Sequence, residues 1–241
     1  MKSKLFYLIS FLVILTSLGF AESKMNLPVN VFDFGFVPQQ SQATCRFWIY
    51  SAGADTLHII DVRPGCGCTK APLEKKIIPP GDSTYVDITF NTGQYKGRTS
   101  KSITISAADS VPAQHVTILS TVYPDTFVND VLSIKPAILE LTGTAKGQEV
   151  KFTIENKTSE EVMPALSIIP EGLIEIYLPK SIPPGKIAEG KIKTISEIPL
   201  GFAKSFTFNI GDSEQAIYTV PIKGKPVGQS AKAPLQAVKP K

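Results

Sequence analysis

The segment Cys45-Arg46-Phe47-Trp48-Ile49-Tyr50 has the two-residue alternation that is typical of a β-strand. Successive side chains of a β-strand point to opposite faces, so the three odd-numbered residues share one face and the three even-numbered residues share the other. The odd-numbered face is apolar and predicts a buried surface with Cys45 in it. The other face carries Trp48 and Tyr50, which we expect to be exposed and which could form a contact surface for a partner.

A second copy of this pattern lies 105 residues further along the chain, in Val150-Lys151-Phe152-Thr153-Ile154-Glu155. The turn Ile78-Pro79-Pro80-Gly81 returns 104 residues later as Ile182-Pro183-Pro184-Gly185. Residues 101–105 return 103 residues later as residues 204–208. An offset that drifts by one residue per loop is typical of a duplicated domain with small loop changes.

Both copies are typical of β-structure. Segments rich in branched and aromatic residues alternate with clusters of Gly, Pro, Asn and Asp, and no stretch keeps a helical period for three turns. In the first copy the predicted strands are residues 43–50, 57–62, 85–90, 102–106 and 116–122. Short strands at this spacing favour two tandem immunoglobulin-like β-sandwich domains, over residues 26–124 and 130–224, with a linker near residues 123–125.

The alternation also predicts which residues form the cores. In the first copy these are Phe47, Ile49, Val86, Ile88, Phe90, Ile103 and Ile105. In the second copy they are Phe152, Ile154, Ile192, Phe206 and Phe208.

Residues 1–21 have the three parts of a secretory signal peptide. Lys2 and Lys4 precede an apolar run, and Gly19 and Ala21 provide small residues before a cleavage point at Glu22. The apolar run is shorter than a membrane span requires, so we expect export and cleavage, with no membrane span in the mature chain.

The positive charge lies at the two ends of the chain. The net charge is +4; residues 1–21 hold two Lys and residues 225–241 hold four, without an acid in either, which leaves residues 22–224 at −2. This distribution argues against a nucleic-acid-binding face on the folded part. The composition of residues 225–241 predicts a disordered tail.

The cysteine loop, Gly65-Cys66-Gly67-Cys68-Thr69, is the one local feature that could carry chemistry. Cys66 and Cys68 could bind Zn or Cu(I) as thiolates, with His58 as a third ligand, or form a labile disulfide for thiol exchange. They could also be structural residues of a tight loop. An odd count of three cysteines leaves at least one thiol unpaired, and Cys45 is the candidate, with pairing of Cys45 to Cys66 or Cys68 as the alternative.

Other catalytic patterns are missing from the sequence: it has no G-x-S-x-G, phosphate-loop or H-E-x-x-H motif. Its acids, among them Asp82, Asp87, Asp109 and Glu140, are scattered and are interpreted as turn and surface residues. The sequence therefore predicts a protein that is not an enzyme, with no catalytic residues and no cofactor.

Several motifs in order resemble a bacterial immunoglobulin-like family known only as a domain of unknown function. They are Phe32-Asp33-Phe34-Gly35, the cysteine loop, Ile78-Pro79-Pro80-Gly81 and Phe90-Asn91-Thr92, and they match the string FDFG…N-x-G…CGCT…PG…FNT over residues 30–123. Residues 136–224 look like a divergent copy without CGCT. The family usually has Asn where this chain has Ser51.

The family is similar to Hydin-type and major sperm protein domains, and it often occurs in exported proteins of the Bacteroidetes type. The resemblance implies a fold and a compartment but no catalytic residue.

The leading hypothesis is an exported binding or scaffolding protein of the bacterial envelope, in the periplasm or at the cell surface, with an unidentified protein partner. One alternative is a thiol-redox or copper-binding protein that uses Cys66 and Cys68. Another is a periplasmic two-domain chaperone that lends the edge of a strand containing Val116, Ile118 and Val122 to a client.

Overall fold

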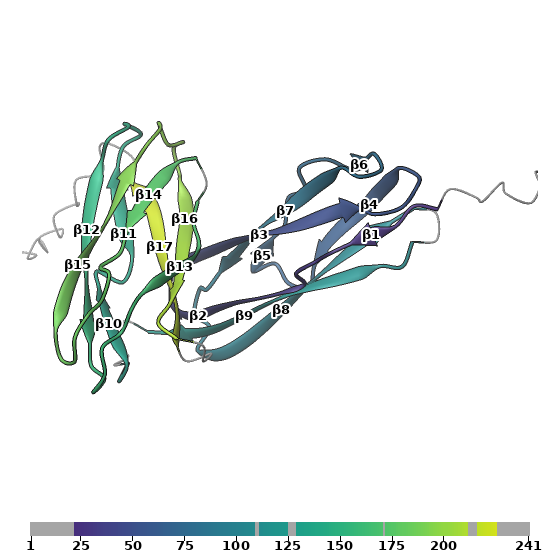
Figure 1. Ribbon diagram of the computed structural model, residues 1–241. Coiled ribbons are helices and arrows are strands. Elements are labelled where there is room, and N and C mark those ends of the chain that lie inside the picture. Colours follow the sequence, from purple (N-terminus) through teal and green to yellow (C-terminus); the bar gives the residue numbers. More distant parts are fainter. Residues whose placement is uncertain (1–21, 109–110, 125–128, 171, 212–215, 226–241) are drawn as a thin grey trace, which may run out of the picture.

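A computed structural model describes residues 22–108, 111–124, 129–170, 172–211 and 216–225 (Figure 1). These residues are mainly strands joined by turns and irregular segments, and no α-helix occurs among them, which confirms the all-β prediction. The predicted signal peptide and residues 226–241 of the predicted tail lie outside the described residues.

The part of the chain before residue 125, here called the N-terminal half, contains the first nine strands. They are β1 (Met25–Asn26), β2 (Val31–Pro38), β3 (Gln42–Ser51), β4 (Leu57–Pro64), β5 (Thr69–Lys70), β6 (Ile77–Ile78), β7 (Ser83–Asn91), β8 (Gly97–Ala107) and β9 (Gln114–Tyr123). The five strands predicted from sequence lie within β3, β4, β7, β8 and β9, which confirms them.

Residues 129–225, here called the C-terminal half, contain the other strands. They are β10 (Leu132–Lys135), β11 (Leu139–Thr142), β12 (Glu149–Asn156), β13 (Ala165–Ile168), β14 (Ile174–Tyr177), β15 (Ile187–Thr194), β16 (Ala203–Asn209) and β17 (Ile217–Lys225).

The strands form three sheets that pack as sandwich-like layers around two cores. One sheet has the order β1-β3-β7-β5 and another the order β10-β12-β15-β14. The third runs through both halves in the order β13-β16-β17-β2-β9-β8-β4-β6, and β11 also pairs with β17.

All the predicted core residues are buried, and they divide between two hydrophobic clusters as expected. The pattern of β7, in which every second residue is buried, shows why alternation predicted them.

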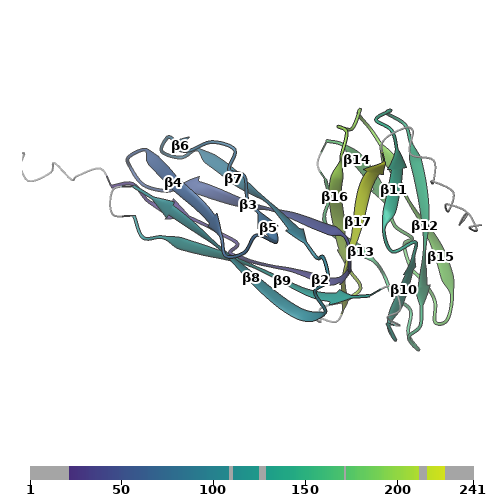
Figure 2. The same ribbon diagram turned by 180° about the vertical axis from the view of Figure 1, so that it is seen from behind.

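The sheet that runs through both halves differs from the expected pair of separate sandwiches. Strand β2 of the N-terminal half lies parallel to β17 of the C-terminal half, with Phe36 opposite Tyr218. In Figure 1 and in the reverse view of Figure 2, the long strands of the N-terminal half run across those of the C-terminal half.

Gly35 permits the close approach of β2 to β17. Its φ is +60°, and a Cβ atom at this position would lie 2.0 Å from the carbonyl oxygen of Ile217. Asp33 fixes the bend, because its Oδ1 accepts a hydrogen bond from the Gly35 amide at 2.7 Å. Arg98 holds the same carboxylate through two bonds of 3.1 and 2.7 Å. The Phe32-Asp33-Phe34-Gly35 motif therefore shapes the contact between the two halves.

Side chains from each half pack against the core of the other. Phe36 packs against the C-terminal core and stacks on Tyr218, with 5.4 Å between the ring centroids. Ile168 packs in the opposite direction, against the N-terminal core. The Thr219 hydroxyl donates to the Phe34 carbonyl at 2.7 Å. These contacts hold the two halves in one relative orientation.

Strand β9 does not provide the edge that the chaperone alternative requires. It lies between β2 and β8 in the sheet, so its backbone pairs on both sides. Val116, Ile118 and Val122 are buried in the N-terminal core. Their alternation reflects one buried face of an interior strand, and the expectation of a free edge at β9 was wrong.

The two Ile-Pro-Pro-Gly turns have matching backbone geometry. Gly81 and Gly185 both have positive φ, 78° and 66°. Next to each turn, a carbonyl accepts a hydrogen bond from the backbone amide of the last residue of the neighbouring strand. The Ser51 amide donates to the Asp82 carbonyl at 3.0 Å, and the Asn156 amide donates to the Lys186 carbonyl at 2.9 Å. Ser51 and Asn156 thus occupy equivalent places in the two halves.

The side chains at these equivalent places differ in their hydrogen bonds. Asn156 Nδ2 donates to the carbonyls of Glu160 and Ile182 at 2.7 and 2.8 Å. Asn156 Oδ1 accepts from the amide and the hydroxyl of Thr158. Ser51 Oγ is buried and has no hydrogen-bond partner among the described residues.

We expect Gly35→Ala to destabilise the folded chain by about 2 kcal/mol or more, because the added Cβ meets the β17 backbone in a left-handed conformation. Urea unfolding of the purified protein measures this loss. Gly67→Ala is the matched control, because nothing lies within 4 Å of the added Cβ there. Equal stability of Gly35→Ala and Gly67→Ala would contradict the role assigned to Gly35.

Removal of the two equivalent side chains should have unequal effects. Asn156→Ala removes the four hydrogen bonds of a buried amide side chain and should cost about 2 kcal/mol or more of unfolding free energy. Ser51→Ala removes an unpaired hydroxyl and should change stability by less than about 0.5 kcal/mol. Thermal and urea unfolding of the two variants provide the comparison, and a larger loss for Ser51→Ala would refute the assignment.

Candidate functional site

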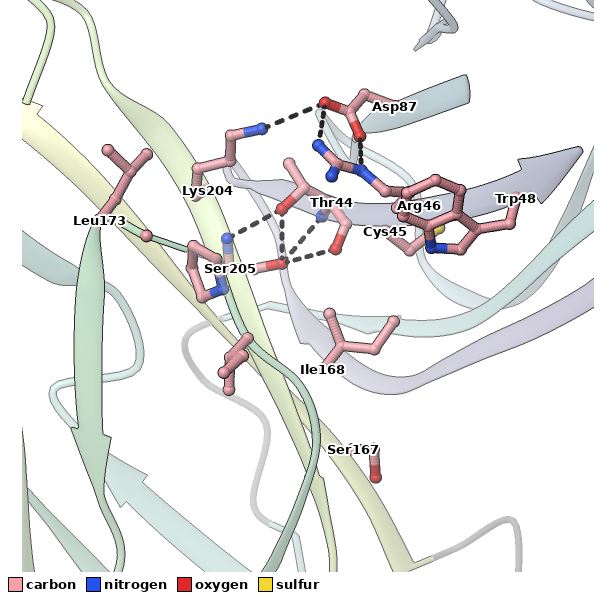
Figure 3. Close-up of a pocket in the computed structure, with 13 residues that line it drawn as sticks. Thr44, Cys45, Arg46, Trp48, Asp87, Ser167, Ile168, Leu173, Lys204 and Ser205 are labelled. Atoms are coloured by element: carbon pink, nitrogen blue, oxygen red, sulfur yellow. Dashed lines mark hydrogen bonds and ion pairs between the residues drawn. The ribbon is translucent and has the colours of Figure 1, made fainter. Parts of the chain in front are cut away.

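A cavity of about 490 Å³ lies where the two halves meet (Figure 3). Its N-terminal wall comes from β3 and β7, and its C-terminal wall comes from β13, β16 and the segment that follows β13. The described residues that line it are Thr44, Cys45, Arg46, Trp48, Asp87, Ser167, Ile168, Ile169, Pro170, Gly172, Leu173, Lys204 and Ser205. We call it the junction cavity, and its volume is within the range of ligand sites.

Trp48 is the aromatic group of the junction cavity. It lies on the outward face of β3, as alternation predicted, and is 41% exposed. Its ring meets Tyr85 of β7 edge-on, with 5.3 Å between centroids. Tyr50 lies on the same face of β3 and is also exposed, but it does not line the cavity. Of the two aromatic residues that the sequence analysis grouped together, only Trp48 therefore lines the cavity.

Charged side chains line the wall next to Trp48. Arg46 and Asp87 are opposite each other on β3 and β7 and form a two-pronged ion pair, with Nε–Oδ1 at 2.7 Å and a second bond of 3.0 Å. The Arg46 guanidinium lies over the Tyr85 ring, 3.6 Å from its centroid. Lys204 approaches the same carboxylate from the C-terminal half at 3.9 Å. All three charges are partly exposed, so their main effect is on the orientation and charge of the wall, with little effect on stability.

The base of the junction cavity is a reciprocal hydrogen-bonded contact between the two halves. The Thr44 amide donates to Ser205 Oγ at 2.8 Å, and the Ser205 amide donates to Thr44 Oγ1 at 3.0 Å. Both residues are buried. This contact holds β16 against β3 and fixes the distance between the walls of the cavity.

Sequence reasoning missed most of the junction cavity. The sequence predicts a surface position for Asp87 and shows Lys204 and Ser205 only as members of the repeat. Arg46 and Asp87 both occupy outward positions of predicted strands, which is a weak signal for a cross-strand pair. The contact between Thr44 and Ser205 joins residues 161 positions apart, and nothing in the local sequence indicates it.

Cys66 and Cys68 form a disulfide, with 5.3 Å between their Cα atoms. Both residues are half-buried, and the Thr69 hydroxyl lies 3.6 Å from Cys66 Sγ and 3.8 Å from Cys68 Sγ. The loop is also held by the backbone, because the Gly65 amide donates to the Ser102 carbonyl and the Asn91 amide to the Cys68 carbonyl. In this oxidised form the two sulfurs cannot bind a metal as thiolates.

Cys45 is a buried free thiol at the inner side of the junction cavity. Burial raises the pKa of the Cys45 thiol well above its ordinary value, and the Asp87 carboxylate raises that pKa further. A thiol that stays protonated is a poor nucleophile and a poor metal ligand.

The described residues contain no group of three or more His, Cys, Asp or Glu side chains placed to hold a metal ion. They also contain no helix with the length and apolar character needed to cross a membrane.

Residues 25–122 match a family described as "Protein of unknown function (DUF1573)". The match runs from the start of β1 almost to the end of β9, and it agrees with the resemblance to a family of unknown function seen in the motifs. No curated protein matches the chain significantly.

Solved structures give weak superpositions. A protein of unknown function from Porphyromonas gingivalis W83 is 9% identical, with 83% of this chain and 99% of that chain covered and a TM-score of 0.35. The secreted serine protease VesC from Vibrio cholerae is 11% identical, with 83% and 50% covered and a TM-score of 0.34. The YadV chaperone is 10% identical, with 83% and 98% covered and a TM-score of 0.31. These scores are too low to support an argument about function.

The three cysteines should differ sharply in their reaction with a maleimide at about pH 8. We expect no label on the native oxidised protein, two labels after mild reduction, at Cys66 and Cys68, and a third label at Cys45 only after denaturation. Burial and the raised pKa of Cys45 are the reasons. Peptide mass spectrometry locates each label, and Cys45→Ser is the control. A label on Cys45 in the native protein would contradict this prediction, because it would show that the thiol is accessible in the folded state.

Proposed function

We propose that this protein is an exported, non-enzymatic binding or scaffolding protein of the bacterial envelope, and that the junction cavity is its binding site. The observation that carries the proposal is the composition of the cavity. An exposed indole, Trp48, lies beside the cations of Arg46 and Lys204 in a wall that both halves build. Aromatic and arginine side chains are the residue types that contribute most to binding at protein interfaces.

The state of the ionisable groups supports binding over catalysis. Asp87 accepts both prongs of Arg46 and lies near Lys204, so its carboxylate is engaged by cations. The Cys45 thiol is buried, and its pKa is raised. Neither group is arranged as a nucleophile or as a general base.

Two features support export. Residues 1–21 have the pattern of a cleavable signal peptide. A disulfide between Cys66 and Cys68 fits an oxidising compartment outside the cytoplasm.

Thiol exchange at the cysteine loop is the second candidate function, favoured by the half-buried position of the disulfide. A thiolate of an external dithiol would attack one sulfur, and the other cysteine would leave as a thiolate. The second thiolate of the dithiol would then release the reduced loop as its own disulfide forms. The copper alternative would need this reduction first.

Site-specific photo-crosslinking in intact cells tests the binding proposal. A photoreactive residue at Ser167, which is exposed and lines the junction cavity, should capture a distinct envelope protein. The same residue at Ile187, which is exposed on β15 and outside the cavity, is the matched control. Trp48→Ala should reduce the Ser167 product several-fold, because it removes the central aromatic contact.

Other results would reject the proposal. Identical products from positions 167 and 187, or no product from position 167, would show that the junction cavity binds no protein. Recovery of the protein from the cytoplasm with residues 1–21 intact would reject export, whereas an N-terminus at Glu22 in the envelope fraction would support it.

A further inference from the structure

We propose that the junction cavity binds an extended, apolar segment of a partner polypeptide, which adds as a strand to the open edge of β13. This inference rests on the proposed binding function and specifies the chemistry of the ligand. Strand addition takes its affinity from backbone hydrogen bonds and its specificity from the alternate side chains.

Strand β13 is the last strand of its sheet. It pairs with β16 on one side, and no other strand of the described residues lies on its second side. It borders the junction cavity through Ser167 and Ile168. Leu166 and Ile169 are 40% and 47% exposed, which is unusual for apolar residues at a sheet edge.

The edge of β13 carries no charge, and only its short length, Pro164 before it and a bulge between Leu166 and Ile168 restrict pairing there. Residues 162–170, Val-Met-Pro-Ala-Leu-Ser-Ile-Ile-Pro, contain no charge. Among the described residues, each of the other terminal strands contains a charged residue or directly follows one: Lys24 before β1, Lys70 in β5, Lys76 before β6, Lys135 in β10, Glu140 in β11 and Glu175 in β14. Charged residues at edges block pairing with another chain. Among the terminal strands of the described residues, β13 alone has no charge in it or directly before it, so no charge opposes the pairing of a short segment there.

The opposite wall of the cavity favours a single extended segment over a second copy of the protein. This wall is β3, which pairs with β7 on one side, with Trp48 opposite Tyr85. On its other side β1 pairs only with Tyr50 and Ser51, so no strand of the described residues pairs with that side at Trp48. Ile168 packs against the N-terminal core, and the cavity between the walls has a volume of about 490 Å³. A cavity of this volume has room for a few residues of one extended chain but not for a folded sheet of a second copy.

The side chains of the walls define the preferred segment. Ile168, Leu173 and Trp48 offer apolar contacts, which suit apolar residues at alternate positions. Arg46 and Lys204 outnumber Asp87 at the charged wall, so an acidic residue suits the segment better than a basic one.

The test begins with a displayed library of random octapeptides, selected on the mature full-length protein. We expect enriched peptides with alternating apolar residues and an acidic residue. Synthetic copies are then titrated against the protein, and the fluorescence of Trp48, the sole tryptophan of the chain, reports binding in the cavity. Leu166→Lys places a charge on the β13 edge and should weaken binding about tenfold or more. Ile187→Lys, a matched change at an exposed isoleucine outside the cavity, should leave affinity within about twofold.

A second measurement does not depend on a protein variant. N-methylation removes one backbone donor of the peptide at a time, so methylation at alternate positions should abolish binding, while methylation at the positions between should have little effect. The absence of enriched peptides, equal affinity for Leu166→Lys and the original protein, or a uniform response to N-methylation would each overturn strand addition. So would a dimer in sedimentation analysis that Leu166→Lys converts to monomer, because β13 would then serve a second copy.

The peptide experiments and the crosslinking test of the proposed function can fail independently of each other. A partner captured at Ser167, with no peptide binding, would reject strand addition and leave the binding function standing. Peptide binding without an envelope partner would support the β13 edge as a peptide site and reject the envelope role.

Discussion

The close approach of two backbones at Gly35 is the constraint on which the arrangement of the molecule depends. A residue with a side chain cannot occupy this position without a collision with the Ile217 carbonyl, which Cβ would approach to 2.0 Å. Glycine therefore allows β2 to lie along β17 and to continue one sheet through both halves. Asp33 and Arg98 then hold the bend from the other side. Without this contact, no backbone pairing would continue the sheet from one half into the other.

The junction cavity is a consequence of that constraint. Pairing of β2 with β17 brings β16 against β3, where Ser205 and Thr44 exchange hydrogen bonds. The same placement brings Lys204 toward Asp87 and Ile168 onto the N-terminal core. Neither half has the cavity by itself, because its walls come from different halves. A change in the relative orientation of the halves would separate the walls, even if each core stayed intact.

The sequence predicted what depends on local periodicity and missed what depends on long-range pairing. Alternation in residues 45–50 and 85–90 identified β3, β7 and their buried residues, because a half-buried strand shows a period of two. The motif that contains Gly35 was recognised, but its role needs the position of Ile217, 182 residues away. The exposure of Trp48 followed from its even-numbered position, because the odd-numbered residues of this strand face the core. The open edge of β13 and the interior position of β9 depend on the order of strands in the sheet, which periodicity does not contain.

A fixed junction also determines how a partner segment would be recognised. Because the walls are held by the shared sheet, the protein loses little conformational entropy on binding, and the ordering cost lies with the segment. Backbone pairing with β13 is largely independent of side chains, so discrimination between segments would come from the apolar contacts and from Arg46 and Lys204. Recognition of this kind tolerates several sequences that share an alternating apolar pattern. Such tolerance suits a scaffolding role better than selection of one strictly defined ligand.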